Sequence, residues 1–198
     1  MSKGEATRTA VLREAMAMAS TVGFRGLTIG TLADRTGMSK SGLFAHFRSK
    51  EQLQVAVLDA GAHYFADVVV RPAVKVPRGE PRLRALFDRL LRWDTGDLSL
   101  PGGCLFMKTS AELDDDTPSA VRDRLVETER DYIDTLAAVF RTGVSEGHFA
   151  ADADPEQFAF DLEGVLLAHH RASRLLADPK AEDRARAAFE ALLQARRP

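Results

Sequence analysis

Cysteine is almost absent from this sequence of 198 residues, in which Cys104 stands alone. One cysteine cannot form a disulfide within the chain, and it excludes zinc sites built on paired cysteines. No segment approaches the ~20 uninterrupted apolar residues that a membrane-spanning helix needs. The first residues, Met1–Arg8, contain no apolar core. We therefore expect no secretory signal, no membrane association and a cytoplasmic location.

The motifs of common enzymes and metal sites are missing as well. The sequence contains no HExxH, no GxSxG and no glycine-rich phosphate loop. His169 and His170, with Asp161 and Glu163 nearby, are an alternative acid–base or metal group. Neighbouring residues on a helix point about 100° apart, however, so only one of the two histidines should face any single site. We expect no catalytic residue, no metal ion and no cofactor, and a helical-bundle enzyme is the remote alternative.

Charge is unevenly distributed along the chain, although the net charge is only −2. Residues 1–50 contain eight basic and three acidic side chains, a net charge of +5. Residues 51–198 contain 19 basic and 26 acidic side chains, a net charge of −7. A basic segment on an acidic body is typical of a protein that meets a polyanion at one end. A solvated surface can carry the same excess, so charge alone does not decide for nucleic acid.

Apolar residues recur at helical spacing throughout, and no alternating strand pattern or internal repeat is present. The first helix should end at Gly23, with Val22 on its buried face. Prolines that follow capping residues predict further helix starts at Thr117-Pro118, Asp154-Pro155 and Asp178-Pro179. The sequence therefore predicts an all-α protein of about nine helices.

Two short helices and one long helix are predicted within and just after the basic segment. Thr28 should N-cap the first short helix, and Ser39 the second. A capping sequence at Ser49 starts the long helix, which should end at Pro72 or Pro77. Helices this short must pack across each other to be stable, and the apolar residues available for this are Leu32, Ala33, Met38, Leu43 and Phe47. The arrangement is a helix-turn-helix, whose second helix has an outward face free to enter a major groove.

The segment Leu27–Leu53, LTIGTLADRTGMSKSGLFAHFRSKEQL, resembles the tetracycline-repressor (TetR) family of transcriptional regulators. The resemblance implies a helix-turn-helix DNA-binding domain over residues 1–50 and a ligand-binding and dimerisation domain over residues 51–198. It implies a homodimer formed through the last two helices, about Pro155–Leu176 and Lys180–Arg196. It also implies repression at a palindromic double-stranded DNA operator, relieved by an unknown small-molecule effector. Ligand-independent regulation or activation is the alternative.

The resemblance further implies that the helix from Ser39 to His46 reads the major groove. Thr28, His46 and Lys50 would then lie near backbone phosphates, although a structural role for His46 is an equal alternative. Phe44 stands where the family commonly has a tyrosine, so the hydrogen bond of that hydroxyl to a phosphate is lost. The predicted DNA-contacting residues are Thr28, Ser39, Lys40, Ser41, Gly42, Phe44, Ala45, His46 and Lys50.

Elementary physics supports several of these roles. Thr28 and Lys50 stand at helix starts, where free N–H groups attract anions, and Lys50 adds a full positive charge. Lys40, Ser41 and Ala45 are expected to face base edges. A protein that coats DNA without sequence preference is a third class, but an acidic chain with one compact basic end lacks the extended positive surface for it.

An effector pocket is expected among the middle helices. The residues there with large apolar surface and a few polar groups are Phe87, Trp93, Cys104, Phe106, Met107, Tyr132, Phe140 and His169. The alternative for each of them is that it packs in the hydrophobic core and contacts no ligand.

Overall fold

The computed structural model describes residues 3–95, 98, 100–114 and 117–198 and confirms the all-α fold. These residues form ten α-helices and two π-helical segments, with no β-strand among them. The chain forms two compact units, Met1–Phe65 with Ser99–Glu129 and Ala66–Leu98 with Arg130–Pro198. Each unit combines segments that are distant in sequence. The domain boundary expected at residue 50 stays a prediction.

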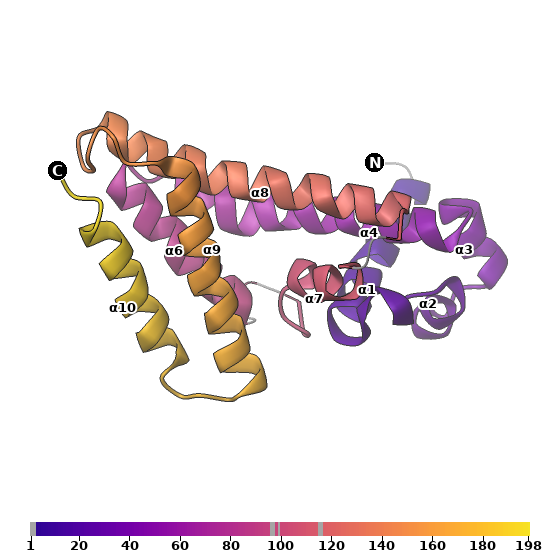
Figure 1. The fold of residues 1–198 in the computed structure, drawn as a ribbon. Coiled ribbons are helices and arrows are strands. Elements are labelled where there is room, and N and C mark those ends of the chain that lie inside the picture. Colours follow the sequence, from indigo (N-terminus) through magenta and orange to yellow (C-terminus); the bar gives the residue numbers. More distant parts are fainter. Residues whose placement is uncertain (1–2, 96–97, 99, 115–116) are drawn as a thin grey trace. The chain divides into compact units, whose positions relative to one another are not determined.

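The first unit is built around the N-terminal helices. It contains α1 (Lys3–Gly26), α2 (Ile29–Thr36), α3 (Lys40–Phe47), α4 (Lys50–Phe65), α7 (Leu105–Glu112) and the first part of α8 (Ala120–Ser145). Both α4 and α7 pack against α1 (Figure 1). Gly23 has a φ of 76°, so it interrupts α1 as predicted, but helical turns continue to Gly26. Val22, directly before the interruption, is 56% exposed, so its predicted burial is wrong.

The second unit contains the C-terminal helices and an aromatic core. Its helical elements are η1 (Ala66–Val70), α5 (Arg71–Val74), α6 (Glu80–Thr95), the rest of α8, α9 (Pro155–His170), η2 (Arg171–Leu175) and α10 (Ala181–Gln194). Helices α9 and α10 lie side by side and are joined by a turn (Figure 1). Phe87 stacks on Phe189 with ring centroids 3.9 Å apart. Phe140 stacks on both Phe149 and Phe158, and these contacts join α8, the loop that follows it and α9 into one core.

One of the three helix starts predicted from prolines is confirmed. The Asp154 carboxylate caps α9 by accepting the N–H of Gln157 at 3.1 Å. Helix α8 starts at Ala120, because the hydroxyl that caps it belongs to Ser119, so the predicted start at Thr117 is wrong. The start predicted at Asp178 is also too early. Its carboxylate accepts the N–H of Lys180 in a turn, and α10 begins after that turn.

The long helix that begins after Ser49 changes type before it reaches the prolines. It becomes π-helical at Ala66–Val70 and resumes as α5, with Pro72 in the first turn, where the missing N–H costs no hydrogen bond. The stretch Lys50–Val74 is long and apolar enough to span a membrane by length and composition. A core helix passes the same test. Leu53 and Val57 of this stretch are completely buried.

The loop before α7 is fastened to the end of α1. The N–H of Gly102 donates to the hydroxyl of Ser20 at 3.1 Å, and Lys108 Nζ donates to the carbonyls of Ser20 and Thr21 at 2.8 and 3.0 Å. A Cβ atom on Gly102 would lie 1.7 Å from the Ser20 carbonyl oxygen. The two backbones therefore require glycine at this position.

We expect Gly102→Ala to lower the free energy of unfolding by about 1–3 kcal/mol, because the loop must move away from α1. Urea unfolding of the purified variant measures this. Gly37→Ala is the matched control, since its φ of 68° is strained for alanine but no atom lies within 4 Å of the new methyl group. If Gly102→Ala lowers the free energy of unfolding by no more than Gly37→Ala does, the steric account is contradicted.

Candidate nucleic-acid interface

The start of α2 is fixed by a reciprocal pair of threonines. The hydroxyl of Thr28 accepts the N–H of Thr31 at 3.1 Å, and the hydroxyl of Thr31 accepts the N–H of Thr28 at 3.0 Å. The predicted N-cap is therefore confirmed, and it forms a full capping box. Lys40 extends toward this turn, with its Nζ 4.0 Å from the point where a Cβ on Gly30 would lie. Lys40 thus places an ammonium group beside the positive end of α2.

The turn between α2 and α3 has the conformation predicted from its residues. Gly37 has a φ of 68°, and its N–H donates to the carbonyl of Ala33 at 2.9 Å. Ser39 then caps α3, since its hydroxyl accepts the N–H of Gly42 at 3.1 Å. The Ser41 hydroxyl lies 3.2 Å from that of Ser39. These contacts confirm the helix-turn-helix and hold α3 in a defined orientation relative to α2.

One face of α3 is buried and the other is open. Leu43 and Phe47 are buried against the rest of the first unit, whereas Met38, which was predicted in the core, is only half-buried. The exposed residues of α3 are Lys40, Ser41, Phe44 and Ala45. Gly42 and His46 are half-buried, and the His46 ring centroid lies 6.1 Å from that of Phe47. Both a structural role and a phosphate contact remain compatible with this position of His46.

Three side chains hold the segment that leads into α2. Lys50 Nζ donates to the carbonyl of Arg25 at 3.4 Å, and Gln54 Nε2 donates to the carbonyl of Phe24 at 2.6 Å. The carboxylate of Glu112 accepts the backbone N–H of Arg25 at 2.8 Å. Gln54 and Glu112 were not predicted from the sequence. A polar residue on the apolar face of α4 is a usable signal for Gln54, but no local pattern links Glu112 to Arg25.

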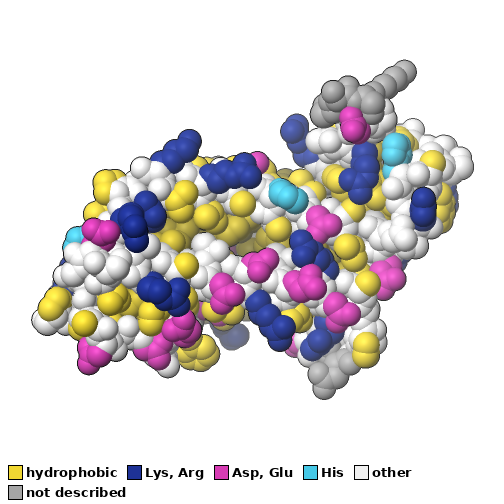
Figure 2. Space-filling view, turned by 90° about the horizontal axis from the view of Figure 1, so that it is seen from above, with side chains coloured by type: hydrophobic (Ala, Val, Ile, Leu, Met, Phe, Trp, Pro, Cys, Tyr) yellow, Lys and Arg dark blue, Asp and Glu magenta, His cyan; other side chains and the backbone are white. Residues whose placement is uncertain are grey.

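Basic and acidic side chains are interspersed on the face of the molecule drawn in Figure 2. Among the described residues, no group of three or more histidine, cysteine, aspartate or glutamate side chains could hold a metal ion.

The residues predicted for the effector pocket are distributed over both units. Cys104, Phe106 and Met107 belong to the first unit. The second unit contains Phe87, Trp93, Tyr132, Phe140 and His169. Phe87 and Phe140 form the aromatic stacks of the core, as the alternative interpretation had it. The role of the eight residues in binding an effector stays a prediction.

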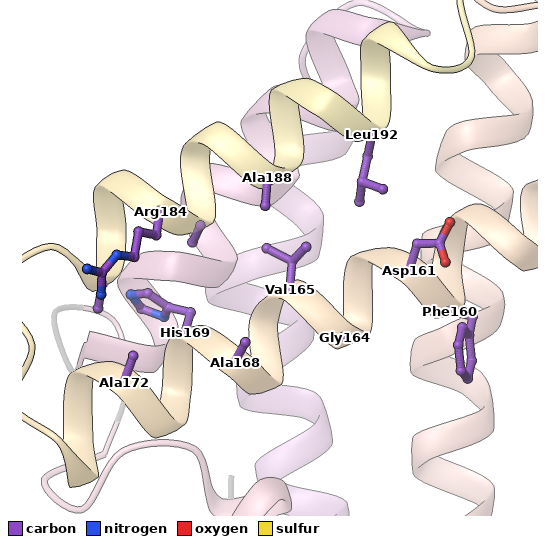
Figure 3. A pocket seen from close by; sticks show the side chains of 12 residues that line it. Phe160, Asp161, Gly164, Val165, Ala168, His169, Ala172, Arg184, Ala188 and Leu192 are labelled. Carbon is purple, nitrogen blue, oxygen red and sulfur yellow. The ribbon is translucent and has the colours of Figure 1, made fainter.

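A groove of about 650 Å³ runs between α9 and α10. Val165 of α9 faces Ala188 of α10 across it, and His169 lies closer to Arg184 (Figure 3). Phe160, which also lines the groove, is 71% accessible, and Leu167 of the same helix is 49% accessible. The second unit thus presents a broad apolar face on its last two helices.

Asp94 accepts hydrogen bonds from two histidines beneath this groove. Its two oxygens lie 2.7 Å from His169 Nδ1 and 2.5 Å from His170 Nδ1. The expectation that only one of these histidines can face a single site is wrong, because one carboxylate reaches both rings with its two oxygens. Burial raises the pKa of Asp94, but the hydrogen bonds from both histidines outweigh burial and hold that pKa below its ordinary value.

Two family models match the chain. "Bacterial regulatory proteins, tetR family" matches residues 11–57, and "Tetracyclin repressor-like, C-terminal domain" matches residues 79–189. No curated protein sequence matches the chain at a significant level.

Solved structures of TetR-family regulators share the fold. One from Cytophaga hutchinsonii has a TM-score of 0.88 at 20% identity, covering 100% of this chain and 98% of its own. One from Chloroflexus aurantiacus J-10-FL has a TM-score of 0.83 at 24% identity, covering 98% and 96%. The structure of AibR in complex with isovaleryl coenzyme A and operator DNA has a TM-score of 0.72 at 21% identity, covering 94% and 98%. With both family models matched along most of its length, the chain belongs to the TetR family of transcriptional regulators.

Proposed function

We propose that this chain is a homodimeric, sequence-specific repressor that binds a palindromic operator and leaves it when a small-molecule effector binds. The outward face of α3 carries the proposal. It is held by caps at both short helices and exposes four side chains, while its opposite face is buried. A helix presented in this way fits a major groove. We further propose that the protein is cytoplasmic and has no catalytic activity.

Phosphate contacts are assigned to the ends of the helix-turn-helix. Thr28 and Lys40 lie together at the N-terminal turn of α2, where the helix dipole and an ammonium group favour an anion. We therefore assign Lys40 to a phosphate, in place of the base edge expected from the sequence. Lys50 supplies a second positive charge at the start of α4, and His46 stands between these positions in the sequence. The surface that enters the groove is formed by the N-cap Ser39 and by four residues of α3: Ser41, Gly42, Phe44 and Ala45.

Dimerisation is assigned to the apolar face of α9 and α10. Four of the exposed residues of α9 fall at i, i+4, i+7 and i+8, which is one stripe of a helix: Phe160, Gly164, Leu167 and Ala168. The other two, Glu156 and Gln157, lie in its first turn. The corresponding exposed residues of α10 include Ala187 and Ala191. Small residues let helices approach closely, and a self-complementary face suits a two-fold dimer. Two copies would then place two α3 helices on two half-sites.

One relative supports an effector-binding site. AibR was solved in complex with isovaleryl coenzyme A and operator DNA, so that regulator binds both a small molecule and DNA. For the present chain we propose that the effector shifts the population of dimers away from the geometry that matches the operator.

Selection of bound duplexes from a random pool by the purified protein tests the proposed function. We expect a partly palindromic consensus to be enriched, and failure to enrich any sequence at low salt would contradict operator binding. Release of the selected duplex then provides the assay for an effector screen.

We expect Lys50→Ala to weaken binding to the consensus and to random duplexes by a similar factor. The reason is that Lys50 contacts a phosphate and no base, so its loss should also lower the slope of log affinity against log salt by about one per site contacted. Titrations at several salt concentrations measure both effects. Arg48→Ala, which removes an exposed charge next to the start of α4, is the comparison. An unchanged salt slope in Lys50→Ala would rule out the phosphate contact.

A further inference from the structure

Of the side chains that most often read bases through paired hydrogen bonds, helix α3 carries only Lys40. Its residues, Lys40–Phe47, are all described by the structure and include no arginine, asparagine or glutamine. The ammonium group of Lys40 lies beside Gly30 of α2. Bidentate hydrogen bonding from α3, the commonest form of direct base recognition, is therefore poorly supported in this chain.

Two of the four exposed residues of α3, Phe44 and Ala45, are instead apolar. Ser41, Phe44 and Ala45 stand at i, i+3 and i+4, so they share one face of the helix. All three are exposed, and the Phe44 side chain is 48% accessible although its neighbour Leu43 is completely buried. The core is thus filled by other residues, and folding does not explain an aromatic ring at this position. We call Phe44 and Ala45 the apolar patch of α3.

Only one apolar group projects from base edges into the major groove, and that is the C5-methyl group of thymine. A phenylalanine ring can neither donate nor accept a conventional hydrogen bond, so it gains little from a phosphate or a polar base edge. Contact with a methyl group, by contrast, removes apolar surface of both partners from water. The shared face with Ser41 directs the ring toward the bases.

We infer that Phe44, together with Ala45, reads thymine methyl groups in each half-site of the operator. Phe44 is then a specificity-determining residue of this chain. The inference rests on the proposed operator binding, and it adds which chemical group of the DNA is recognised. The rival arrangement, in which the ring packs on sugar and phosphate, gives no preference for any base.

Replacing single thymines of the selected consensus by deoxyuridine tests the inference, because this removes the methyl group and leaves base pairing intact. For the wild-type protein, we expect an affinity loss of about fourfold when the critical thymine is replaced in one half-site. Replacement in both half-sites should cost about 15-fold. For Phe44→Ala, the same replacements should have an effect of about twofold or less.

Two further variants complete the experiment. Phe44→Tyr keeps the ring and should keep the response to deoxyuridine. Val22→Ala truncates another exposed apolar side chain of the first unit, outside α3, and should behave as wild type.

Each remaining outcome decides the inference. An equal loss of affinity on deoxyuridine replacement in wild type and in Phe44→Ala overturns the inference and leaves the proposed function standing. If Phe44→Ala loses affinity by the same factor for all duplexes, the ring contacts the sugar-phosphate backbone, and the inference is again overturned. Failure to select any consensus overturns both the inference and the proposed function.

Discussion

Phe160→Glu should convert the dimer into monomers and abolish tight operator binding. The ring is 71% exposed on the apolar face of α9, and we assign it to the contact between copies. Burial of a phenylalanine side chain contributes about 1.5–3 kcal/mol, and a two-fold interface contains the residue twice. Glutamate removes this contribution and adds two charges that must lose their water. The dimer dissociation constant should rise by about 100-fold or more.

Sedimentation equilibrium over a range of concentrations measures the dissociation constant directly. Val74→Glu is the matched control, because Val74 is a 41% exposed apolar residue of α5 outside the proposed interface. It should leave the dimer intact. A dimer of unchanged affinity in Phe160→Glu would show that the two copies meet elsewhere.

Asp94→Ala should strongly destabilise the second unit. The carboxylate is buried and is the hydrogen-bond partner of both His169 Nδ1 and His170 Nδ1. Its removal leaves two ring nitrogens without that partner and opens a small cavity. We expect the free energy of unfolding to fall by about 3 kcal/mol, measured by urea denaturation. Asp94→Asn keeps the shape of the side chain and one acceptor oxygen, so it should lower the free energy of unfolding by less.

The pH dependence of this effect has a defined sign. Because the pKa of Asp94 lies below its ordinary value of 3.8 in the folded chain, the folded state binds its proton less readily than the unfolded state does. The contribution to stability is therefore present above the ordinary pKa and is lost as the pH falls through the folded pKa. The stability difference between wild type and Asp94→Ala should shrink below pH 3.8. A difference that stays constant in this range would contradict the ionised state of Asp94.

Local signals predicted the helix-turn-helix well. Thr28 and Ser39 cap their helices through the N–H group three residues ahead, and Gly37 adopts the left-handed turn. These interactions involve neighbours in sequence, so the sequence pattern is sufficient to find them. The start of α8 shows the limit of such rules, because Thr117 and Ser119 are both capable caps and the structure uses the second.

Contacts between distant residues could not be predicted from one sequence. Glu112 and Arg25 are 87 positions apart, and His169 and Asp94 are 75 positions apart. Neither pair leaves a periodic or compositional pattern, since each depends on how whole helices pack. The predicted effector pocket had the same weakness. Large apolar residues between helices mark a core as readily as a cavity, and Phe140 lies in an aromatic stack.

The mass of the complex with the selected consensus duplex tests the central claim most directly. The account predicts an even number of chains on a palindrome whose half-site centres lie about one helical turn, roughly 34–36 Å, apart. It also predicts that half of the palindrome alone binds much more weakly. A single chain bound to an asymmetric sequence, with full affinity, would contradict a dimeric regulator that reads DNA through α3.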